Sequence, residues 1–327
     1  MKPTDSGSLP QRGLTLTELV VAMAVAGILM TAAYGIFLVQ QKTYAVQDQM
    51  TRTQQNARVA MNVLARDLRM AGHGVPLLPI TIGGEDHRNI VSVGAGGSDL
   101  TLLGCFGAPE GYLSKSAGIG ALQIDLRNTD EADKFDEGNR RYIFIGEYDK
   151  AVVVGKEGKT LTLAEGLKKR YPTTRLTERV DAGKTRIQVA DTSDIYMGDI
   201  LTLGDEILYV TETAKNVIDF DTDPTTPLAD PIQNKYEKDT VVNPIPIFRV
   251  QAVRYFRDAD ETMRREDLSG GGGQALAENI WALNVTPQVP PDNPTYQIVL
   301  TARSDLPDKA GNYRTRTYNF SVARRNF

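Results

Sequence analysis

The sequence predicts an α+β protein in which one long N-terminal helix precedes a mostly antiparallel β head. Two observations predict this division. The segment Leu19–Val39 is apolar throughout, and from Ile36 to Ala71 the chain contains neither glycine nor proline, as a long helix requires. After Pro76 the hydrophobic pattern changes to short β-prone runs that are separated by turn residues.

Length and composition are those of an ordinary globular protein. The chain has 327 residues, 41% of them hydrophobic and 24% charged, with a formal net charge of −4. These values exclude a disordered, a collagen-like or a disulfide-dense chain, and they allow one large domain or two ordinary ones. The mild acidic balance gives no global reason to expect nucleic acid. The single cysteine, Cys105, excludes an intrachain disulfide and leaves the redox compartment open.

Residues 19–39 have the length and composition of a membrane-spanning helix. No charged residue occurs between Glu18 and Lys42. As a helix this segment extends about 32 Å, which matches the roughly 30 Å hydrocarbon core of a bilayer. A core helix of a soluble domain normally shows a polar face, and this segment has none. We therefore predict one transmembrane helix here.

The residues before this segment are only partly those of a secretory signal. Met1–Gly13 is polar and carries Lys2 and Arg12, which supply a positive flank. Ala32-Ala33 is compatible with cleavage, but the apolar run is longer than the roughly 7–15 residues of a signal peptide. Glu18 stands at the start of the run, where an unpaired acid costs roughly 3 kcal/mol in a membrane. Glu18 is therefore a candidate functional residue.

The octapeptide Arg12-Gly13-Leu14-Thr15-Leu16-Thr17-Glu18-Leu19 closely resembles the type IV prepilin cleavage and methylation motif. In that family a prepilin peptidase cuts after the glycine, on the cytoplasmic side, and methylates the new N-terminus. The resemblance implies that residues 1–13 are a leader peptide ending at Gly13. It also implies that Leu14 is the N-methylated first residue of the mature chain. Leu14 departs from the phenylalanine that is commonest there.

The same resemblance gives a role to Glu18, which would be the fifth residue of the mature chain. In such filaments this acid pairs with the N-terminal amine of a neighbouring subunit and sets the axial register. Opposite charges attract more strongly in a helix bundle of low dielectric constant than in water, and neither charge is then left bare. The alternative is that Glu18 is an acid at a helix N-terminus that interacts with the helix dipole.

The second half of the predicted helix carries a stripe suited to packing on a head. Apolar residues recur there every three or four positions, at Val46, Met50, Ala57, Ala60/Met61, Leu64, Leu68 and Ala71. Gly72, Gly74 and Pro76 then end the helix. We predict a helical stem over residues 14–76, of which one half is buried in membrane or filament and the other packs on the head. A long coiled-coil anchor is the alternative, but the stripe lasts fewer than four heptads.

Residues 77–327 are predicted to form the β-rich head. Turn segments such as Gly94-Ala95-Gly96-Gly97 separate its β-prone runs. Between about residues 172 and 243 the chain has the pattern of a compact β unit, which we interpret as a candidate subdomain. No exact internal repeat is evident in the sequence.

Further segments narrow the resemblance to PilW-type minor pilins. The stem end, Gln54-Gln55-Asn56-Ala57-Arg58 followed by Leu64–Gly72, is similar to theirs. Tyr255 with Met263-Arg264-Arg265, the segment Ala275–Ile280 and the closing segment Arg316–Asn326 resemble a pattern that PilW-type proteins share with J-type secretion pseudopilins. The likeness is strongest over about residues 1–76 and weakest in the middle of the chain.

The head carries no recognisable active site. His73 and His87 have no spaced second ligand, and no nucleophile, phosphate-binding or zinc motif is present. Cys105 lies in an apolar run without a basic neighbour, so a buried structural thiol is expected. Asp219–Asp223 begins like a calcium loop, but Pro224 stands where that loop needs glycine. We therefore predict no enzyme activity, no metal and no cofactor.

Basic residues gather near the C-terminus, at Arg303, Arg314, Arg316, Arg324 and Arg325. Such a patch can release counterions on contact with DNA. However, no nucleic-acid-binding motif or aromatic platform accompanies it. Solvated strand faces or subunit contacts are expected instead, and nucleic acid is not an expected partner.

The resemblance implies a minor pilin, a non-enzymatic subunit that takes part in type IV pilus assembly, at the priming or tip complex. The implied partners are other pilin subunits, the prepilin peptidase and the assembly platform of the inner membrane. The chain would cross the inner membrane once, with its head in the periplasm, before it enters the pilus at the cell surface. The alternatives are a J-type pseudopilin of type II secretion and, in another class, a pilus-borne adhesin or DNA-uptake receptor.

Overall fold

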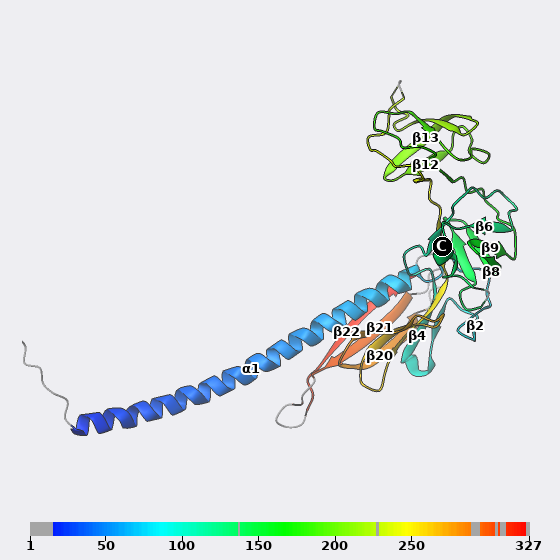
Figure 1. The fold of residues 1–327 in the computed structure, drawn as a ribbon. Coiled ribbons are helices and arrows are strands. Elements are labelled where there is room, and N and C mark those ends of the chain that lie inside the picture. Colours follow the sequence, from blue (N-terminus) through cyan, green and yellow to red (C-terminus); the bar gives the residue numbers. More distant parts are fainter. Residues whose placement is uncertain are drawn as a thin grey trace, which may run out of the picture.

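A long N-terminal helix projects from a β-rich head (Figure 1). The computed structural model describes residues 16–136, 138–226, 229–288, 295–304, 307 and 312–324. Helix α1 spans Leu16–Met70, and its 55 residues extend about 82 Å. In the described parts of the head, every strand pairing is antiparallel. The predicted α+β fold class is therefore confirmed.

The two halves of α1 have different surroundings. Residues 16–45 are exposed on all sides, and the most apolar 18-residue window of α1 has a mean hydropathy of 2.2, which suits a membrane span. From Val46 onward one face turns inward, and its buried members include Thr53, Ala57, Ala60, Leu64 and Leu68. The apolar stripe seen in the sequence is therefore the face that packs on the head. Thr31 in the apolar half donates its hydroxyl hydrogen to the carbonyl of Gly27 at 2.8 Å, so this polar group is satisfied within the helix.

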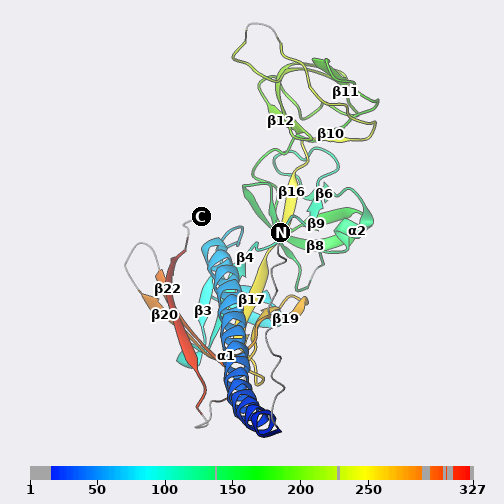
Figure 2. The ribbon, with the colours of Figure 1, turned by 90° about the vertical axis from the view of Figure 1, so that its left-hand side faces the viewer.

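The part of the head next to α1 contains two sheets that share one core with the helix. One sheet has the order β19-β18-β17-β4-β3 and the other β20-β21-β22, with the hairpin β1–β2 beside them. Buried side chains of α1 and of both sheets form a continuous cluster, and Figure 2 shows α1 lying across this region. The strands are β1 (Ile80–Ile82), β2 (Glu85–His87), β3 (Val91–Val93), β4 (Asp99–Gly104), β17 (Gln251–Arg257), β18 (Met263–Asp267), β19 (Gly272–Ala277), β20 (Ile280–Gln288), β21 (Thr295–Arg303) and β22 (Thr315–Ala323).

A six-stranded unit, the middle barrel, follows this region of the head. Its strand order is β5-β16-β7-β8-β9-β6, and a bridge between Leu113 and Leu126 joins the two edge strands, so that the sheet closes on itself. Its own hydrophobic core lies inside. The elements are β5 (Gly111–Tyr112), β6 (Gln123–Asp125), the short helix α2 (Thr129–Ala132), β7 (Tyr142–Ile145), β8 (Asp149–Glu157), β9 (Thr160–Leu163) and β16 (Pro246–Arg249).

A second six-stranded unit, the distal barrel, lies farthest from the N-terminal end of α1 (Figures 1 and 2). Its order is β10-β15-β12-β13-β14-β11, and a bridge between Leu176 and Val189 closes it around a separate core. Its strands are β10 (Thr174–Arg175), β11 (Arg186–Gln188), β12 (Ile200–Leu203), β13 (Glu206–Ala214), β14 (Val217–Asp221) and β15 (Val241–Val242).

The two barrels are built in the same way. When the strands of each are numbered from its own start, both have the spatial order 1-6-3-4-5-2. Both residues of the closing bridge in the distal barrel stand 63 positions after their counterparts in the middle barrel. The fourth strand of each barrel has a register shift at the same place, after Val153 and after Val210. The structure thus contains an internal repeat that the sequence does not reveal.

A polar clasp closes the middle barrel. The buried carboxylate of Asp149 accepts a hydrogen bond from the Tyr171 hydroxyl at 2.9 Å. It also accepts hydrogen bonds from the backbone N–H groups of Lys168 and Lys169, at 3.1 and 3.0 Å. Burial and the neighbouring carboxylate raise the pKa of Tyr171, so its hydroxyl remains a donor.

The distal barrel repeats this clasp with equivalent residues. The Glu206 carboxylate accepts from the Tyr236 hydroxyl at 2.9 Å and from the backbone N–H groups of Gln233 and Asn234, each at 2.8 Å. Burial and the same carboxylate raise the pKa of Tyr236 to about 12. Burial tends to raise the pKa of Glu206, but these hydrogen bonds together lower it. The repeat therefore extends to the polar contacts of the two units.

The barrels are nested along the chain. The distal barrel lies between the fifth and sixth strands of the middle barrel, which itself lies between β4 and β17. The ends of the distal barrel meet where Thr174 pairs with Val242. Arg170 of the middle barrel binds both carboxylate oxygens of Asp199, at 2.7 and 3.0 Å, and its guanidinium lies 4.5 Å from the ring centre of Tyr196.

Because the ends of the distal barrel meet, we expect this unit to be removable. Deletion of residues 174–242, with Thr173 joined to Asn243 through two glycines, should leave a cooperative thermal transition in the remaining chain. The lost Arg170–Asp199 pair is partly exposed and is worth about 1 kcal/mol, so Tm should change by no more than about 4 °C. Circular dichroism of the chain in detergent measures this. A matched deletion of residues 142–163, which removes three strands of the middle barrel, should abolish the transition of that barrel. Loss of cooperativity in the first deletion would contradict the expectation.

Candidate assembly site on the N-terminal helix

The predicted site residues belong to the N-terminal end of the chain. Gly13 and Leu14 lie outside the described residues. Glu18 lies in the first turn of α1, two residues after the helix begins at Leu16. In both ribbon views the N-terminal end of the helix lies at the opposite end of the molecule from the distal barrel (Figures 1 and 2).

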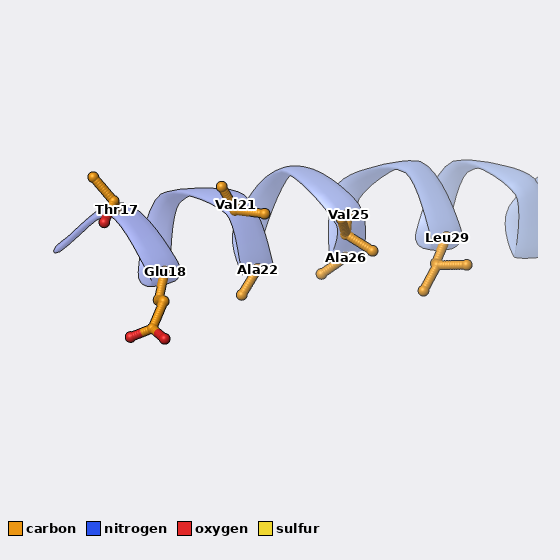
Figure 3. A pocket seen from close by; sticks show the side chains of 7 residues that line it. All are labelled: Thr17, Glu18, Val21, Ala22, Val25, Ala26 and Leu29. Carbon is orange, nitrogen blue, oxygen red and sulfur yellow. The ribbon is translucent and has the colours of Figure 1, made fainter. Parts of the chain in front are cut away.

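Glu18 lies at the N-terminal end of a face of α1 that carries small and branched side chains (Figure 3). Ala22 and Ala26 follow Glu18 at intervals of four residues, which places all three on one side of the helix. Small side chains at such a face allow a neighbouring helix to approach closely in a membrane or a bundle. A shallow surface pocket runs along it, lined by Thr17, Glu18, Val21, Ala22, Val25, Ala26 and Leu29. The face is therefore suited to helix–helix contact beside a carboxylate.

Two energies bear on the Glu18 carboxylate at the start of α1. The positive end of the helix dipole favours an acid in the first turn by about 0.3–1 kcal/mol. An acid at membrane depth costs roughly 3 kcal/mol. In a membrane or a bundle core, a nearby positive charge would favour the ionised form of Glu18.

The N-terminal region matches a known protein family. The family model, described as the prokaryotic N-terminal methylation motif, covers residues 9–34. This range includes the octapeptide, Glu18 and much of the apolar segment. The chain carries a prepilin-type methylation motif. A comparison with curated proteins found no match to the chain.

The methylation motif supports a place for the chain among type IV pilins and pseudopilins. Proteins with this motif are structural subunits of type IV pili or of type II secretion systems. The peptidase processes them, the apolar helix anchors them in the membrane, and they assemble with other pilins. The match therefore supports the resemblance drawn from the octapeptide at the level of this wider class.

A second feature, the joint between stem and head, was not predicted from the sequence. Asp67 lies on the inner face of α1 and is 1% exposed. Its Oδ2 atom accepts a hydrogen bond from the Tyr255 hydroxyl at 2.5 Å and another from Arg265 Nε at 2.9 Å. Burial, together with the Asp67 carboxylate, raises the pKa of Tyr255, so this hydroxyl stays a donor. One buried carboxylate thus joins α1 to both β17 and β18.

The described head residues that were considered for chemistry are engaged in packing and hydrogen bonds. Within the described ranges no cluster of three or more His, Cys, Asp or Glu side chains is arranged to hold a metal ion. Cys105 is buried, and burial raises the pKa of its thiol to about 12, which confirms the predicted buried thiol. His87 is also buried, with Nε2 at 3.2 Å from the carbonyl oxygen of Ile82. The His73 ring packs edge-on against Phe144.

The acidic residues of Asp219–Asp223, the segment that resembles a calcium loop, form contacts within the distal barrel. Asp219 is on β14 and pairs with Arg186 of β11 at 2.6 Å. Asp221 Oδ1 accepts hydrogen bonds from the backbone N–H groups of Asp223 and Asp230, each at 2.9 Å. These contacts close the turn that follows β14.

One of the C-terminal arginines is engaged in contacts within the head. Arg303 lies between the rings of Trp281 and Tyr313, at 4.5 and 4.2 Å from their centres, and forms an ion pair with Glu261. Arg316 is exposed on β22. Arg325 lies outside the described residues. Arg303, at least, is used in holding neighbouring segments of the head together.

Proposed function

We propose that the protein is a PilW-like minor pilin, a non-enzymatic subunit that takes part in type IV pilus assembly at the priming or tip complex. The observation that carries this proposal is the methylation motif at the start of a helix that is exposed over residues 16–45. This exposed apolar half would lie in the inner membrane and then among the stems of neighbouring subunits. The packed half would hold the head outside, in the periplasm and later on the pilus.

In this proposal the chain has a leader over 1–13, a stem over 14–76 and a head over 77–327, with a subdomain at about 172–243. The prepilin peptidase cuts after Gly13 and methylates Leu14. Glu18 then pairs with the N-terminal amine of a neighbouring subunit and sets its axial register. The methylation motif, which includes Glu18, supports this pairing. A positive charge beside the carboxylate would offset part of the cost of holding an acid at membrane depth.

The size of the head supports a position at the end of the fibre. Two barrels extend beyond the sheets that pack on α1 (Figure 1). Heads of this bulk fit poorly into every layer of a thin fibre, whereas an end position leaves room for them. Other pilin subunits and the inner-membrane assembly platform would be the partners, and no nucleic acid is required. Deletion of the coding region should then reduce or abolish piliation; a J-type pseudopilin would instead be needed for type II secretion.

Maturation gives the most direct test. The protein extracted from membranes should yield an N-terminal fragment whose mass corresponds to N-methylated Leu14. A Gly13→Val variant should remain uncut, because the peptidase of this family cuts after a small glycine, while Gly7→Val in the same leader should mature normally. Mass spectrometry of the intact chain and of its N-terminal fragment measures both. A wild-type chain that stays uncut, or that is cut beyond Ala32, would overturn the proposal.

A further inference from the structure

The repeat of the two barrels allows their outer surfaces to be compared residue by residue. In the middle barrel Ile145 pairs with Asp149 and Ile247, and in the distal barrel Leu203 pairs with Glu206 and Val242. These pairings make β7 equivalent to β12. Alternate residues of a strand face opposite sides. The outward positions Tyr142 and Phe144 of β7 therefore correspond to Ile200 and Thr202 of β12.

In the middle barrel this outward face is a buried contact within the protein. Tyr142 is 6% exposed and Phe144 is 4% exposed. Both belong to an apolar cluster with Ile80 and Ile82 of the hairpin β1–β2 and with Cys105 after β4. The outer face of the third strand is thus where the middle barrel docks on the rest of the head.

In the distal barrel the equivalent face is uncovered. Ile200 is 60% exposed and Ile207 of the next strand is 47% exposed. Ile200 pairs directly with Tyr209, and Thr202 with Ile207, so these four side chains form one block on the outer face. Met197, just before β12, adds another side chain that is 77% exposed. We call these five residues the β12–β13 face.

Several other outward positions of the same barrel are polar. Arg186 and Asp219 pair with each other across β11 and β14, and Gln188 is exposed on β11. Apolar exposure on this part of the sheet is therefore concentrated on the strands that correspond to the docking strands of the middle barrel. A contiguous exposed apolar patch of this kind is typical of an interaction site.

We propose that the β12–β13 face binds an apolar protein surface on the head of a neighbouring pilin-type subunit. The equivalent face of the middle barrel already binds an apolar protein surface. A lipid bilayer is a poor fit, because this barrel lies at the opposite end of the molecule from the apolar half of α1 (Figures 1 and 2). Five residues are also far fewer than the roughly 20–30 that each side of a stable free dimer contributes. The contact therefore needs a partner that is already held nearby, as stems in a fibre hold their neighbours.

The identification of the partner as a pilin-type subunit rests on the proposed assembly function. The following test distinguishes failure of the β12–β13 contact from failure of that function. A photo-crosslinking amino acid is placed at Ile200 in the full chain, in the cells that produce it, and the adduct is identified by mass spectrometry. The matched control is the same group at Gln188, an exposed outward position on β11. We expect an adduct from position 200 alone, with a protein that itself has a prepilin-type N-terminus. A second variant, Ile207→Asp, should reduce the yield at position 200 by about tenfold.

Each other result overturns the proposal. Adducts with lipid or with a protein lacking a prepilin-type N-terminus would identify another occupant. Equal adducts from positions 200 and 188 would show that contact is unspecific. If the chain is cut after Gly13 and recovered in sheared fibres but gives no adduct, the β12–β13 face is not a docking surface, and the proposed assembly function still stands. A chain that stays uncut would remove the assembly function, whatever the crosslinking yields.

Discussion

Replacing Asp67 with alanine is expected to lower the free energy of unfolding of the unit formed by the stem and its adjoining sheets by about 3–5 kcal/mol. The substitution removes the acceptor that Tyr255 and Arg265 share. It leaves a hydroxyl and a guanidinium at the helix–sheet contact without their carboxylate, and such uncompensated groups are costly where water is excluded. The loss should therefore exceed that of removing an ordinary helix side chain.

Urea unfolding of the full chain in detergent measures this effect. Trp281 is the only tryptophan of the chain and lies on β20, in a sheet that shares its core with α1, so its fluorescence reports on this region. The matched control is Asp48→Ala, because Asp48 also lies on α1 but pairs with Arg52 on the exposed surface. Its cost should stay below about 1 kcal/mol. Equal midpoints for the two variants would show that the buried carboxylate does not hold the stem to the head.

The presence of a long N-terminal helix, α1, could be predicted from the sequence. Its apolar half and its stripe depend on local periodicity, which a single helix expresses residue by residue. The joint could not be predicted, because Asp67 lies 188 residues before Tyr255 and 198 before Arg265. In the sequence Asp67 is one acid in a segment rich in charged residues. Only the packing of α1 on the sheets shows that it is buried.

The repeat of the barrels was hidden for a different reason. Equivalent core positions keep their apolar character but not their identity, as Ile143 and Leu201 illustrate. The number of residues between equivalent strands also differs between the two barrels. The turn after β7 has three residues, whereas the equivalent turn after β12 has two. Closure of each barrel depends on one bridge between strand ends, and two-residue strands such as Thr174–Arg175 have no periodicity to detect. The two barrels are therefore defined by which strands pair with one another, and not by their amino-acid composition.

The strand β18 shows a limit of hydrophobic patterns. Its sequence, Met263–Asp267, is mostly charged and has no alternating apolar pattern. It is nevertheless a strand inside a five-stranded sheet, because its charges are used there: Arg264 pairs with Asp258, and Arg265 reaches Asp67. Charge pairs, one of them with the distant Asp67, can thus support a strand that lacks an alternating apolar pattern.

The Glu18→Gln variant is expected to be cut and inserted normally but to enter sheared fibres at least about thirtyfold less than the wild type. The proposed pair with a neighbouring N-terminal amine would be worth about 4 kcal/mol at 4 Å and an effective dielectric constant of 20. Glutamine keeps the size of the side chain and removes its charge. The amount of chain in the fibre fraction, relative to mature chain in the membrane, measures the effect. Thr31→Val, on the same apolar half of α1 but outside the octapeptide and without a change of charge, is the matched control and should assemble normally.

The size of this loss distinguishes pairing with a neighbouring subunit from interaction with the helix dipole. At the surface the dipole stabilises an acid in the first turn by no more than about 1 kcal/mol, which corresponds to a change of about fivefold in an equilibrium constant. A fall of less than fivefold for Glu18→Gln would therefore leave only the dipole role. Glu18→Asp provides a further test. It keeps the charge and shortens the side chain by one methylene, so a dipole interaction should be preserved, whereas a pair with a fixed neighbour should be stretched and weakened. Assembly of Glu18→Asp at an intermediate level, between wild type and Glu18→Gln, is the outcome expected if Glu18 sets the register between subunits.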